Sequence, residues 1–555
     1  MAADATRDAD LEAGRAAYAR HAWTEAYERL TAADAAGPLD AWDLERLAIA
    51  GYLLGRPDDS VATGARAHLE AVRAGDIALA LRAAYGVGME LMQRGEMAQS
   101  GGWFARAGRL VEESGYDGVE VGSLLIPQAL QTLMAGQPDA ALGIFEQVAA
   151  IADRFDDAEL RVFGRLGRGQ SLIAMGETRR GVSLLDEAMT AVIAGDIPPI
   201  SSGIVYCAVI EACQSMFDLR RAQEWTAALN RWWESQPDMV PFRGNCLVFR
   251  AVLLRFHGAW GEATDEAQRA REWLSRPPPE PGVGEAIYEL AELDRLRGAF
   301  EAAEAGYREA GTWGRLPEPG LALLQLARGD AAAATASIRR AMAEATDEMV
   351  RARMLEPAAE IALAAGDVAA ARDAADRLGE VADALEAPLL RAMAARTEGT
   401  VRLAEGDVTG ALALLRRAWE AWRELDAPYE AARVRVRTAE ACRRLGDQEG
   451  AAIETEAARE VFERLGAAAD LAALLGRPDP ASIPGGLSAR EVEILRLVAE
   501  GYSNSQLAKM LWVTEQTVKF HLSNIYRKLE VANRTEASRW AHVHGFIAPA
   551  ERTAA

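Results

Sequence analysis

The sequence predicts an all-α protein, in which an α-solenoid of about a dozen helical hairpins, each of about 40 residues, precedes a four-helix domain with a helix-turn-helix. Three observations predict this fold. The short signature G-x-x-x-x-A, or a close relative, recurs mostly in steps of 40 or 41 residues. Strand signals are nearly absent. After a proline-rich stretch, GRPDPASIPGG, the pattern changes to four closely spaced helix starts.

The signature marks the same point in every repeat. Glycine ends the first helix of a hairpin because the left-handed backbone conformation costs little without a Cβ atom. An Asp, Glu or Pro soon afterwards opens the second helix. One hairpin buries little surface alone, so stacking predicts a solenoid over residues 1–465. The signature glycines are Gly55, Gly95, Gly136, Gly176, Gly258, Gly298, Gly329, Gly366, Gly406 and Gly446, and His21 and Phe217 stand in the same place in two further copies.

The repeats contain two further features, proline-rich stretches and a group of tryptophans. Proline-rich stretches at 275–284 and 315–320 are expected to be connecting loops. Tryptophans crowd the middle repeats, and most are expected in the core. The alternative is that some of them line a concave groove and hold a ligand. These tryptophans are Trp225, Trp232, Trp233, Trp260, Trp273 and Trp313.

Charge divides the chain into two parts. The formal net charge is -22, yet residues 487–547 hold eight Lys/Arg against six Asp/Glu, a balance of +2. The last eight residues are neutral, so subtracting this +2 leaves -24 for residues 1–486. An acidic body repels DNA, so nucleic-acid binding is expected only in the tail. The predicted domains are the solenoid at 1–465, a linker at 466–486, a helical domain at 487–548 and a tail at 549–555.

A cytoplasmic protein without a membrane segment is expected. The four cysteines show no CxxC spacing and are too few for a disulfide framework in this length. The N-terminal sequence MAADATRDADLEAG is acidic and lacks the apolar stretch of a signal peptide. The longest uncharged run, at about 121–138, contains Gln, Ser, Gly and Pro and is a poor membrane span.

Four helix starts follow the proline-rich stretch. Each begins with a residue type whose side chain accepts hydrogen bonds from the first backbone N–H groups of a helix. The second and third helices are separated by only a few residues, as in a helix-turn-helix. The expected caps are Ser488 with Glu491, Ser503 with Gln506, Thr514, and Asn533 with Glu536.

The third of these helices has two different sides. At 100° per residue, Val518, Leu522, Ile525 and Leu529 fall on one buried stripe. The opposite side suits base edges in the major groove, and the flank suits phosphate oxygens. The alternative is a solvated amphipathic helix in a small bundle. The opposite side carries Gln516, Lys519, Phe520, Ser523, Asn524 and Arg527, and the flank carries Thr517, His521 and Lys528.

The stretch LSAREVEILRLVAEGYSNSQLAKMLWVTEQTVKFHLSNIYRKLEVANRTEA resembles the LuxR-type, or NarL/FixJ-type, DNA-binding domain. The resemblance implies that 514–529, which begins at Thr514, is the recognition helix. It implies that Lys519, Phe520 and Ser523 contact bases. It also implies that Thr517, His521 and Lys528 contact the DNA backbone.

The repeats resemble the tetratricopeptide class. Their length is similar to the longer variant in the large ATP-dependent LuxR regulators of the maltose-activator type. Those relatives carry an ATPase, but no GxxxxGK[ST] sequence occurs here, so this domain is expected to be lacking. No nucleophile–base constellation and no metal-ligand spacing is visible, so no enzyme activity, cofactor or metal is predicted.

The predicted function is regulation of transcription by binding double-stranded DNA. The solenoid is expected to bind a peptide, a protein or a small-molecule effector, and RNA polymerase or another protein is a further expected partner. A homodimer on DNA is expected through Ala537, Trp540 and Ala541 of the fourth helix, which would place two recognition helices about one DNA turn apart (~34 Å). The alternative is a protein-interaction scaffold whose tail docks a protein rather than DNA.

Overall fold

The computed structural model describes residues 2–236, 238–276, 279–280, 282–345, 347–475, 487, 489–510, 515–529 and 531–543. Within these residues all 29 regular elements are helices and no strand occurs, which confirms the predicted all-α fold. The helices are α1 Ala2–Ala19, α2 Trp23–Ala36, α3 Ala41–Leu53, α4 Pro57–Ala74, α5 Ile77–Gln93, α6 Met97–Ser114, α7 Val119–Met134, α8 Pro138–Phe155, α9 Ala158–Ala174, α10 Thr178–Ala194, α11 Pro199–Ser215, α12 Leu219–Glu234, α13 Arg243–Phe256, α14 Trp260–Leu274, α15 Val283–Leu296, α16 Phe300–Thr312, α17 Gly320–Ala327, α18 Ala331–Glu344, α19 Glu348–Ala364, α20 Val368–Leu385, α21 Pro388–Glu405, α22 Val408–Glu424, α23 Pro428–Arg444, α24 Gln448–Leu465, α25 Ala468–Leu474, α26 Ala489–Ala499, α27 Asn504–Met510, α28 Glu515–Lys528 and α29 Arg534–Val543.

The signature glycines have the backbone conformation that the repeat pattern predicts. All ten lie between the two helices of a hairpin with positive φ, from +68° at Gly55 to +94° at Gly406. His21 and Phe217 adopt the same conformation, with φ of +61° and +60°. A side chain makes this conformation costly, and packing offsets the cost at both places. Phe217 is 6% exposed, and His21 stacks on the ring of Trp23 with centroids 4.9 Å apart.

The proline-rich stretches connect helices, as predicted, although Val283, Gly284 and Gly320 at their ends already belong to the following helices. One separates α14 from α15, and the other separates α16 from α17. In the first stretch, residues 277, 278 and 281 lie outside the described residues. The second stretch is followed by α17, which has only eight residues. This short helix explains why one signature step falls to 31 residues.

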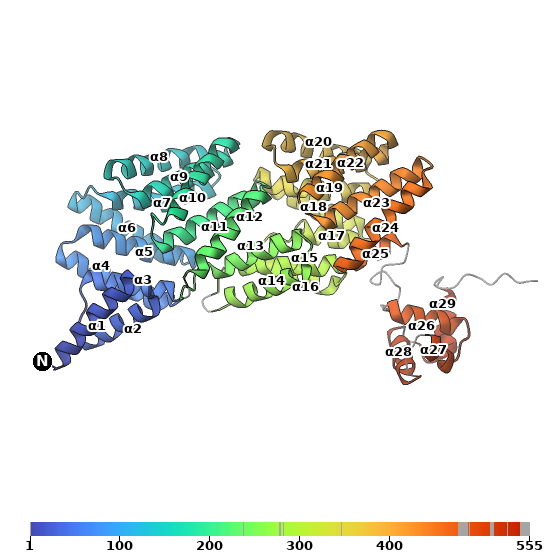
Figure 1. Cartoon of the computed structure of the whole chain (residues 1–555), viewed down its shortest axis with the longest axis horizontal. Coiled ribbons are helices and arrows are strands. Elements are labelled where there is room, and N and C mark those ends of the chain that lie inside the picture. Colours follow the sequence, from blue (N-terminus) through green and yellow to red (C-terminus); the bar gives the residue numbers. More distant parts are fainter. Residues whose placement is uncertain are drawn as a thin grey trace, which may run out of the picture.

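The helices α1–α12, blue to green in Figure 1, form the first superhelical turn of the solenoid. The segment after α12 returns to the first hairpins. The N–H of Val240 donates to the carbonyl oxygen of Leu53 at 2.8 Å. Met239 packs in one apolar cluster with Leu53 and Trp23. The first turn therefore closes on itself across 187 residues of sequence.

The helices α13–α25 form the second superhelical turn. Its early helices, α14 and α15, pack against its late helices, α23 and α24, through a cluster that includes Trp260, Leu293, Tyr429 and Phe462. The ring Nδ1 of His257 lies 2.9 Å from the carbonyl oxygen of Asp426.

The two superhelical turns also contact each other. Phe217, before α12, belongs to the same apolar cluster as Leu390 and Trp422 of the second turn. The guanidinium of Arg353 donates to the carbonyl oxygen of Gln214 at 3.0 Å. The two turns therefore share buried apolar surface as well as a hydrogen bond.

Buried and half-buried ion pairs link the first helices of successive hairpins in the second turn. Arg396 of α21 bonds Glu356 of α19 at 2.7 Å and also bonds Glu430 of α23. Arg433 bonds Glu360 at 2.6 Å and Glu430 at 3.3 Å. Burial alone would raise the pKa of Glu430, but Arg396 and Arg433 outweigh it and lower this pKa to about 2. These carboxylates are therefore charged and neutralised within the chain.

The solenoid continues past the boundary that the sequence predicts. Helix α25, Ala468–Leu474, lies within the predicted linker at 466–486. The hydroxyl of Tyr429 donates to the carboxylate of Asp470 at 3.0 Å, which ties α25 to α23. Residues 476–486 and 549–555 lie outside the described residues.

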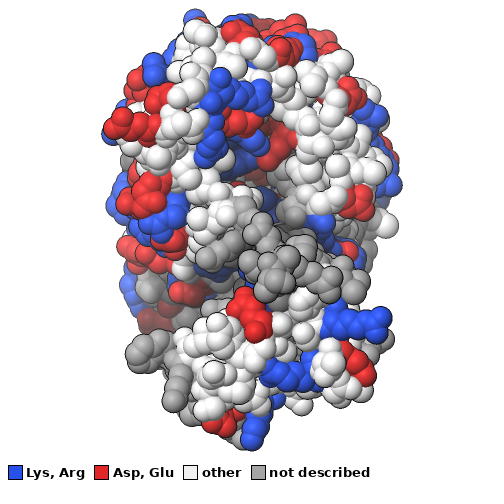
Figure 2. Space-filling view, turned by 90° about the vertical axis from the view of Figure 1, so that its right-hand side faces the viewer, with Lys and Arg blue, Asp and Glu red and all other residues white. Residues whose placement is uncertain are grey.

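The surface of the solenoid carries charges of both signs (Figure 2). Figure 2 shows basic and acidic side chains interspersed over the face of the solenoid in view. In the described part of the chain, no helix is long and apolar enough to cross a membrane. No three His, Cys, Asp or Glu side chains of the described residues come together as metal ligands would. All four cysteines are free.

Candidate nucleic-acid interface

The last four helices, α26–α29, have an apolar core of their own. Helix α26 packs against α28 and α29, and α27 packs against α28. The buried residues are all aliphatic, and they fill the space between the four short helices. They are Leu487, Val492, Ile494, Leu495, Val498, Leu507, Val518, Leu522, Ile525, Leu529, Ala537 and Ala541.

A tight connection sets the angle between α26 and α27. Gly501 has a φ of +96°, and its N–H donates to the carbonyl oxygen of Val498 at 3.1 Å. The predicted capping box then opens α27. The N–H of Ser503 donates to Oε1 of Gln506 at 2.8 Å, and the N–H of Gln506 lies 3.4 Å from Oγ of Ser503. Local hydrogen bonds therefore help to position α27.

The start of α29 is held in two ways. The predicted capping pair is present, because the N–H of Glu536 donates to Oδ1 of Asn533 at 3.0 Å. Arg534 donates to Oδ1 of Asn504 at 3.2 Å and also to the carbonyl oxygen of Tyr502. This arginine therefore ties α29 to the start of α27. Its role in the described residues is structural, although its charge contributes to the basic tail.

Helix α28 buries the stripe that the 3.6-residue period predicts. Val518 and Ile525 are fully buried, Leu522 is 5% exposed and Leu529 is 8% exposed. These four side chains face the other helices of the domain. The opposite side of α28 is therefore turned away from the protein core.

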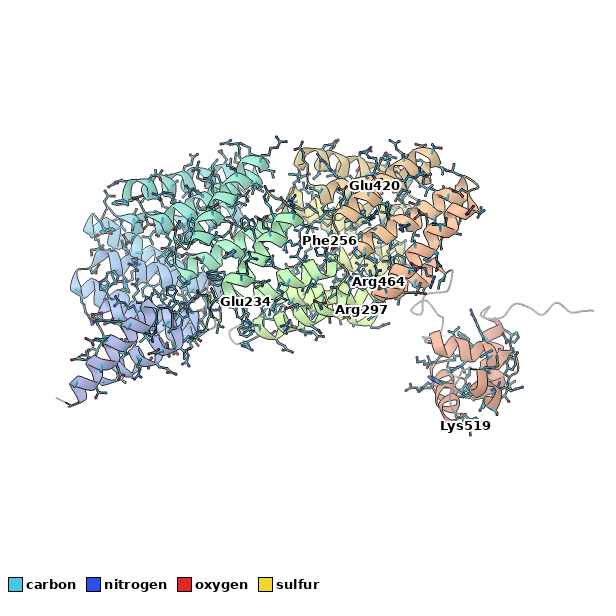
Figure 3. The ribbon with its side chains drawn as sticks, viewed as in Figure 1. Glu234, Phe256, Arg297, Glu420, Arg464 and Lys519 are labelled. Carbon is cyan, nitrogen blue, oxygen red and sulfur yellow. The ribbon has the colours of Figure 1, made fainter. Side chains whose placement is uncertain are left out.

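The exposed side of α28 carries polar and basic groups. Lys519, Ser523 and Arg527 are exposed, whereas His521 and Asn524 are half-buried. Arg527 donates to Oδ1 of Asn524 at 3.3 Å. Figure 3 shows Lys519 at the outer surface of this domain, pointing away from its other helices. Of the other predicted contacts, Thr514 lies outside the described residues, and so do the side chains of Gln516, Thr517 and Phe520.

Lys528 has a partner within the domain. Its Nζ lies 2.8 Å from Oε2 of Glu491, whose side chain is 5% exposed. The pair holds the end of α28 against α26. Sequence reasoning assigned Glu491 only to a helix cap with Ser488, which lies outside the described residues. No sequence signal links residues 491 and 528, because their contact depends on the packing angle of two helices.

The expected dimer contact requires a correction. Ala537 and Ala541 are fully buried in the core of their own domain, so neither is available to a second chain. Trp540 packs against the same core and is partly exposed. Small residues on an amphipathic helix fit a close intramolecular contact as well as a dimer interface. The helical period alone does not distinguish these two uses.

Comparison with known proteins places this domain in a family. Residues 486–541 match the model of the bacterial regulatory proteins of the luxR family. The response regulator protein VraR of Staphylococcus aureus (strain NCTC 8325 / PS 47) is 51% identical over 61 residues. VraR of Staphylococcus saprophyticus subsp. saprophyticus has the same identity over the same length. The match covers 11% of this chain and 29% of each relative.

Two solved structures resemble the chain over a greater length. The APC/C hetero-tetramer Cut9–Hcn1 covers 84% of this chain at 11% identity, and the Rap protein complexed with competence and sporulation factor covers 69% at 13% identity. Both superpose with a TM-score of 0.37. Neither structure identifies a partner for the solenoid. The established resemblance is therefore local, and residues 486–541 form a luxR-family helix-turn-helix domain.

Proposed function

We propose that this chain regulates transcription by binding double-stranded DNA, with α28 in the major groove. The observation that carries the proposal is the division of α28 into a buried aliphatic side and an exposed polar side, within a domain that matches the luxR family. A helix of 14 residues is ~21 Å long and fits a groove about 12 Å wide. The proposal includes no catalytic step.

Individual side chains of α28 have different proposed roles. Lys519 and Ser523, exposed on one side, contact base edges together with Phe520. Thr517 and His521 contact phosphates, which fix the position of the helix. Lys528 keeps 34% of its side chain exposed, so its ammonium can approach a phosphate while it remains bonded to Glu491. The remaining proposed DNA contacts are Thr514, Gln516, Asn524 and Arg527.

Replacement of Lys519 tests the base contact. Lys519→Ala should weaken binding to a specific site by about 1–3 kcal/mol and change binding to random DNA much less. Fluorescence anisotropy with fragments selected from the host genome measures both affinities. Arg539→Ala is the matched control, because Arg539 is an exposed cation on α29 rather than α28. Equal losses on specific and random DNA for Lys519→Ala would contradict the assigned role.

Replacement of Lys528 tests a phosphate contact and a structural role together. Lys528→Ala should lower the affinity for all sequences and make the dependence on salt less steep. It should also lower the melting temperature, because the buried Glu491 carboxylate loses its ion pair with Lys528. An unchanged salt dependence would contradict the phosphate contact, and an unchanged melting temperature would contradict the structural role.

We also propose that the solenoid binds a regulatory partner or effector and that the protein acts in the cytoplasm, where RNA polymerase or another protein is a further partner. The charge of -24 on residues 1–486 should oppose indiscriminate DNA binding by the tail. Deleting residues 1–480 should then raise the affinity for random DNA, since α26–α29 have their own core. An unchanged or lower affinity would contradict this role of the body.

A further inference from the structure

The first superhelical turn contains a cavity of about 640 Å³. Its walls come mainly from the first helices of successive hairpins, α3, α5, α7, α9 and α11. Leu53 lines the cavity, and its carbonyl oxygen receives the N–H of Val240 that closes the turn. Small-molecule sites in proteins occupy about 300–1,000 Å³. The cavity therefore has the size of a site for a small organic ligand.

Negative charge dominates the described residues that line this cavity. Arg82 is their one arginine, and they include no lysine. Arg82 donates to Glu45 at 3.1 Å, and its side chain is 45% exposed. The cavity lining therefore contains five acidic side chains and one guanidinium. The five acidic residues are Glu45, Glu90, Glu120, Asp157 and Glu159.

Neutral groups provide the other hydrogen bonds to these carboxylates. The hydroxyl of Ser60 donates to Oε2 of Glu90 at 2.7 Å, and the hydroxyl of Tyr116 donates to Oε2 of Glu120 at 2.6 Å. The hydroxyl of Ser201 donates to Glu159. A hydroxyl stabilises a carboxylate but leaves its charge in place. Burial raises the pKa of Glu45, Glu90 and Glu159, so the excess of negative charge in the cavity is largest above neutral pH.

Glu90 has an unused acceptor inside the cavity wall. Its residue is 7% exposed, and its buried Oε1 has no hydrogen-bond partner in the structure. Buried polar atoms are almost always paired, because an unpaired acceptor costs about 1–3 kcal/mol. Burial raises the pKa of Glu90 to about 7, against the hydrogen bond from Ser60 and the charge of Arg94. A positively charged donor in the cavity would satisfy this oxygen and favour the ionised carboxylate.

Aromatic rings form another part of the cavity lining. Tyr18, Trp23, Tyr52 and Tyr85 all line the cavity. The faces of such rings attract cations, and their area binds the apolar part of a ligand. Burial raises the pKa of Tyr18 to about 12, so this ring stays neutral. The described residues contain no cluster of metal-ligating side chains, so the wall favours an organic cation over a metal ion.

We propose that this cavity binds a small organic cation, an ammonium or guanidinium group on an apolar or aromatic body, which donates a hydrogen bond to Oε1 of Glu90. The proposal deepens the proposed role of the solenoid as the effector-binding part of the chain. The body of the ligand lies against the aromatic rings, and its charge offsets the carboxylates. The ligand is therefore recognised by charge first and by shape second.

Three probes of similar size and different charge test the proposal on the full chain. They are 2-phenylethylamine, a cation at about pH 8, 2-phenylethanol, which is neutral, and 3-phenylpropanoate, an anion. Isothermal titration calorimetry should give a dissociation constant for the amine at least about tenfold lower than for the alcohol, as expected for a hydrogen bond to a charged group. The anion should not bind. Tyramine and agmatine extend the cation set, with and without a ring.

Two isosteric variants locate the binding. Glu90→Gln keeps the shape and the partner Ser60 but removes the charge, and should weaken amine binding by about tenfold or more while leaving the alcohol unchanged. Glu146→Gln is the matched control, because Glu146 is exposed on α8 outside the cavity lining. It should leave the affinity for the amine as in the natural chain.

Several results would overturn the proposal. One is that none of the cations binds at millimolar concentration. Another is that the alcohol binds as tightly as the amine, or that Glu90→Gln and Glu146→Gln have the same effect. Calorimetry without DNA reports on the cavity alone, and anisotropy with DNA reports on α28 alone. A failure of this site is therefore distinguishable from a failure of the proposed DNA-binding function.

Discussion

Both superhelical turns place buried or half-buried glutamates on the first helices of their hairpins, but they neutralise them in different ways. In the first turn, Glu90 and Glu159 receive hydrogen bonds from serine hydroxyls, and burial raises the pKa of both carboxyls. In the second turn, Glu292 and Glu430 bond to arginines. These arginines outweigh the effect of burial and lower both pKa values to about 2.

In the second turn, the guanidinium of Arg396 is a cation held by side chains of the repeats. The guanidinium of Arg396 lies between Glu356 and Glu430, and it also lies 4.8 Å from the ring centre of Trp422. Carboxylates and an aromatic face therefore surround one positive group. The cavity of the first turn also combines carboxylates with aromatic rings, but Arg94 there pairs with Asp58 and Glu96 rather than with Glu90. One repeat architecture can therefore form either a filled core or a cation site, depending on whether the counter-ion belongs to the chain.

The largest expected effect comes from removing the counter-ion of the second turn. Arg396→Met keeps much of the side-chain volume but leaves Glu356 and Glu430 without this partner, and should lower the free energy of unfolding by about 3–5 kcal/mol. Urea unfolding followed by circular dichroism measures the change. The matched variant in the first turn is Arg82→Met, whose partly exposed pair with Glu45 should contribute less than about 1 kcal/mol. Equal losses of unfolding free energy in the two variants would contradict the difference between the turns.

A smaller change, an increase in the free energy of unfolding, is expected from a variant in the first turn. The pKa of Glu90 is about 7 in the folded protein against an ordinary value of 4.5, so the folded state prefers the protonated form. Its contribution to stability is complete below about pH 4.5 and is lost as pH rises through about 7. Glu90→Gln, which cannot ionise, should therefore raise the free energy of unfolding by roughly 2–3 kcal/mol at about pH 8.

Acid provides the control for this variant. At about pH 4 the carboxyl of Glu90 is largely protonated in both states, so the natural chain and Glu90→Gln should have similar urea midpoints. The groups that act on the charge of Glu90 are Ser60, Arg94 and Asp58. A stabilisation of the same size at both pH values would show that the effect comes from packing rather than from charge.

The smallest effect on stability is expected at a solvent-exposed ion pair between the two turns. Arg179 of the first turn forms an ion pair with Glu386 of the second, and both side chains are exposed. Solvent screens such pairs, so Arg179→Ala should leave the urea midpoint unchanged within error. A lower midpoint would show that surface charge joins the turns, in place of the buried contact around Phe217.

The repeat pattern predicts the hairpins but not the way in which the turns close. A glycine at a fixed place in the signature requires the left-handed conformation, so each connection between helices follows from local chemistry. The contact of Val240 with Leu53 depends instead on small rotations that accumulate over many hairpins. For the same reason the aromatic cavity lies in the first turn around Trp23. None of the six tryptophans of the middle repeats lines it.

The candidate DNA interface was predictable to a similar degree. The helical period identifies the buried side of α28, since Leu522 and Ile525 recur at the spacing of one face. The period predicts on which side of the helix each side chain lies, but it does not predict which residue that side chain contacts. The pair of Lys528 with Glu491 and the burial of Ala541 depend on how α28 and α29 lie against α26, which no local pattern encodes.

Closure of the first turn limits how this array can vary. In an open solenoid each repeat touches only its neighbours, so terminal repeats can be gained or lost without disturbing distant ones. Here the first two hairpins cover Met239 and Val240, and loss of that end would expose apolar side chains near the middle of the chain. Loss of the first hairpins by recombination should therefore be selected against. The same holds for the last hairpins, because α23 and α24 cover apolar side chains of α14 and α15.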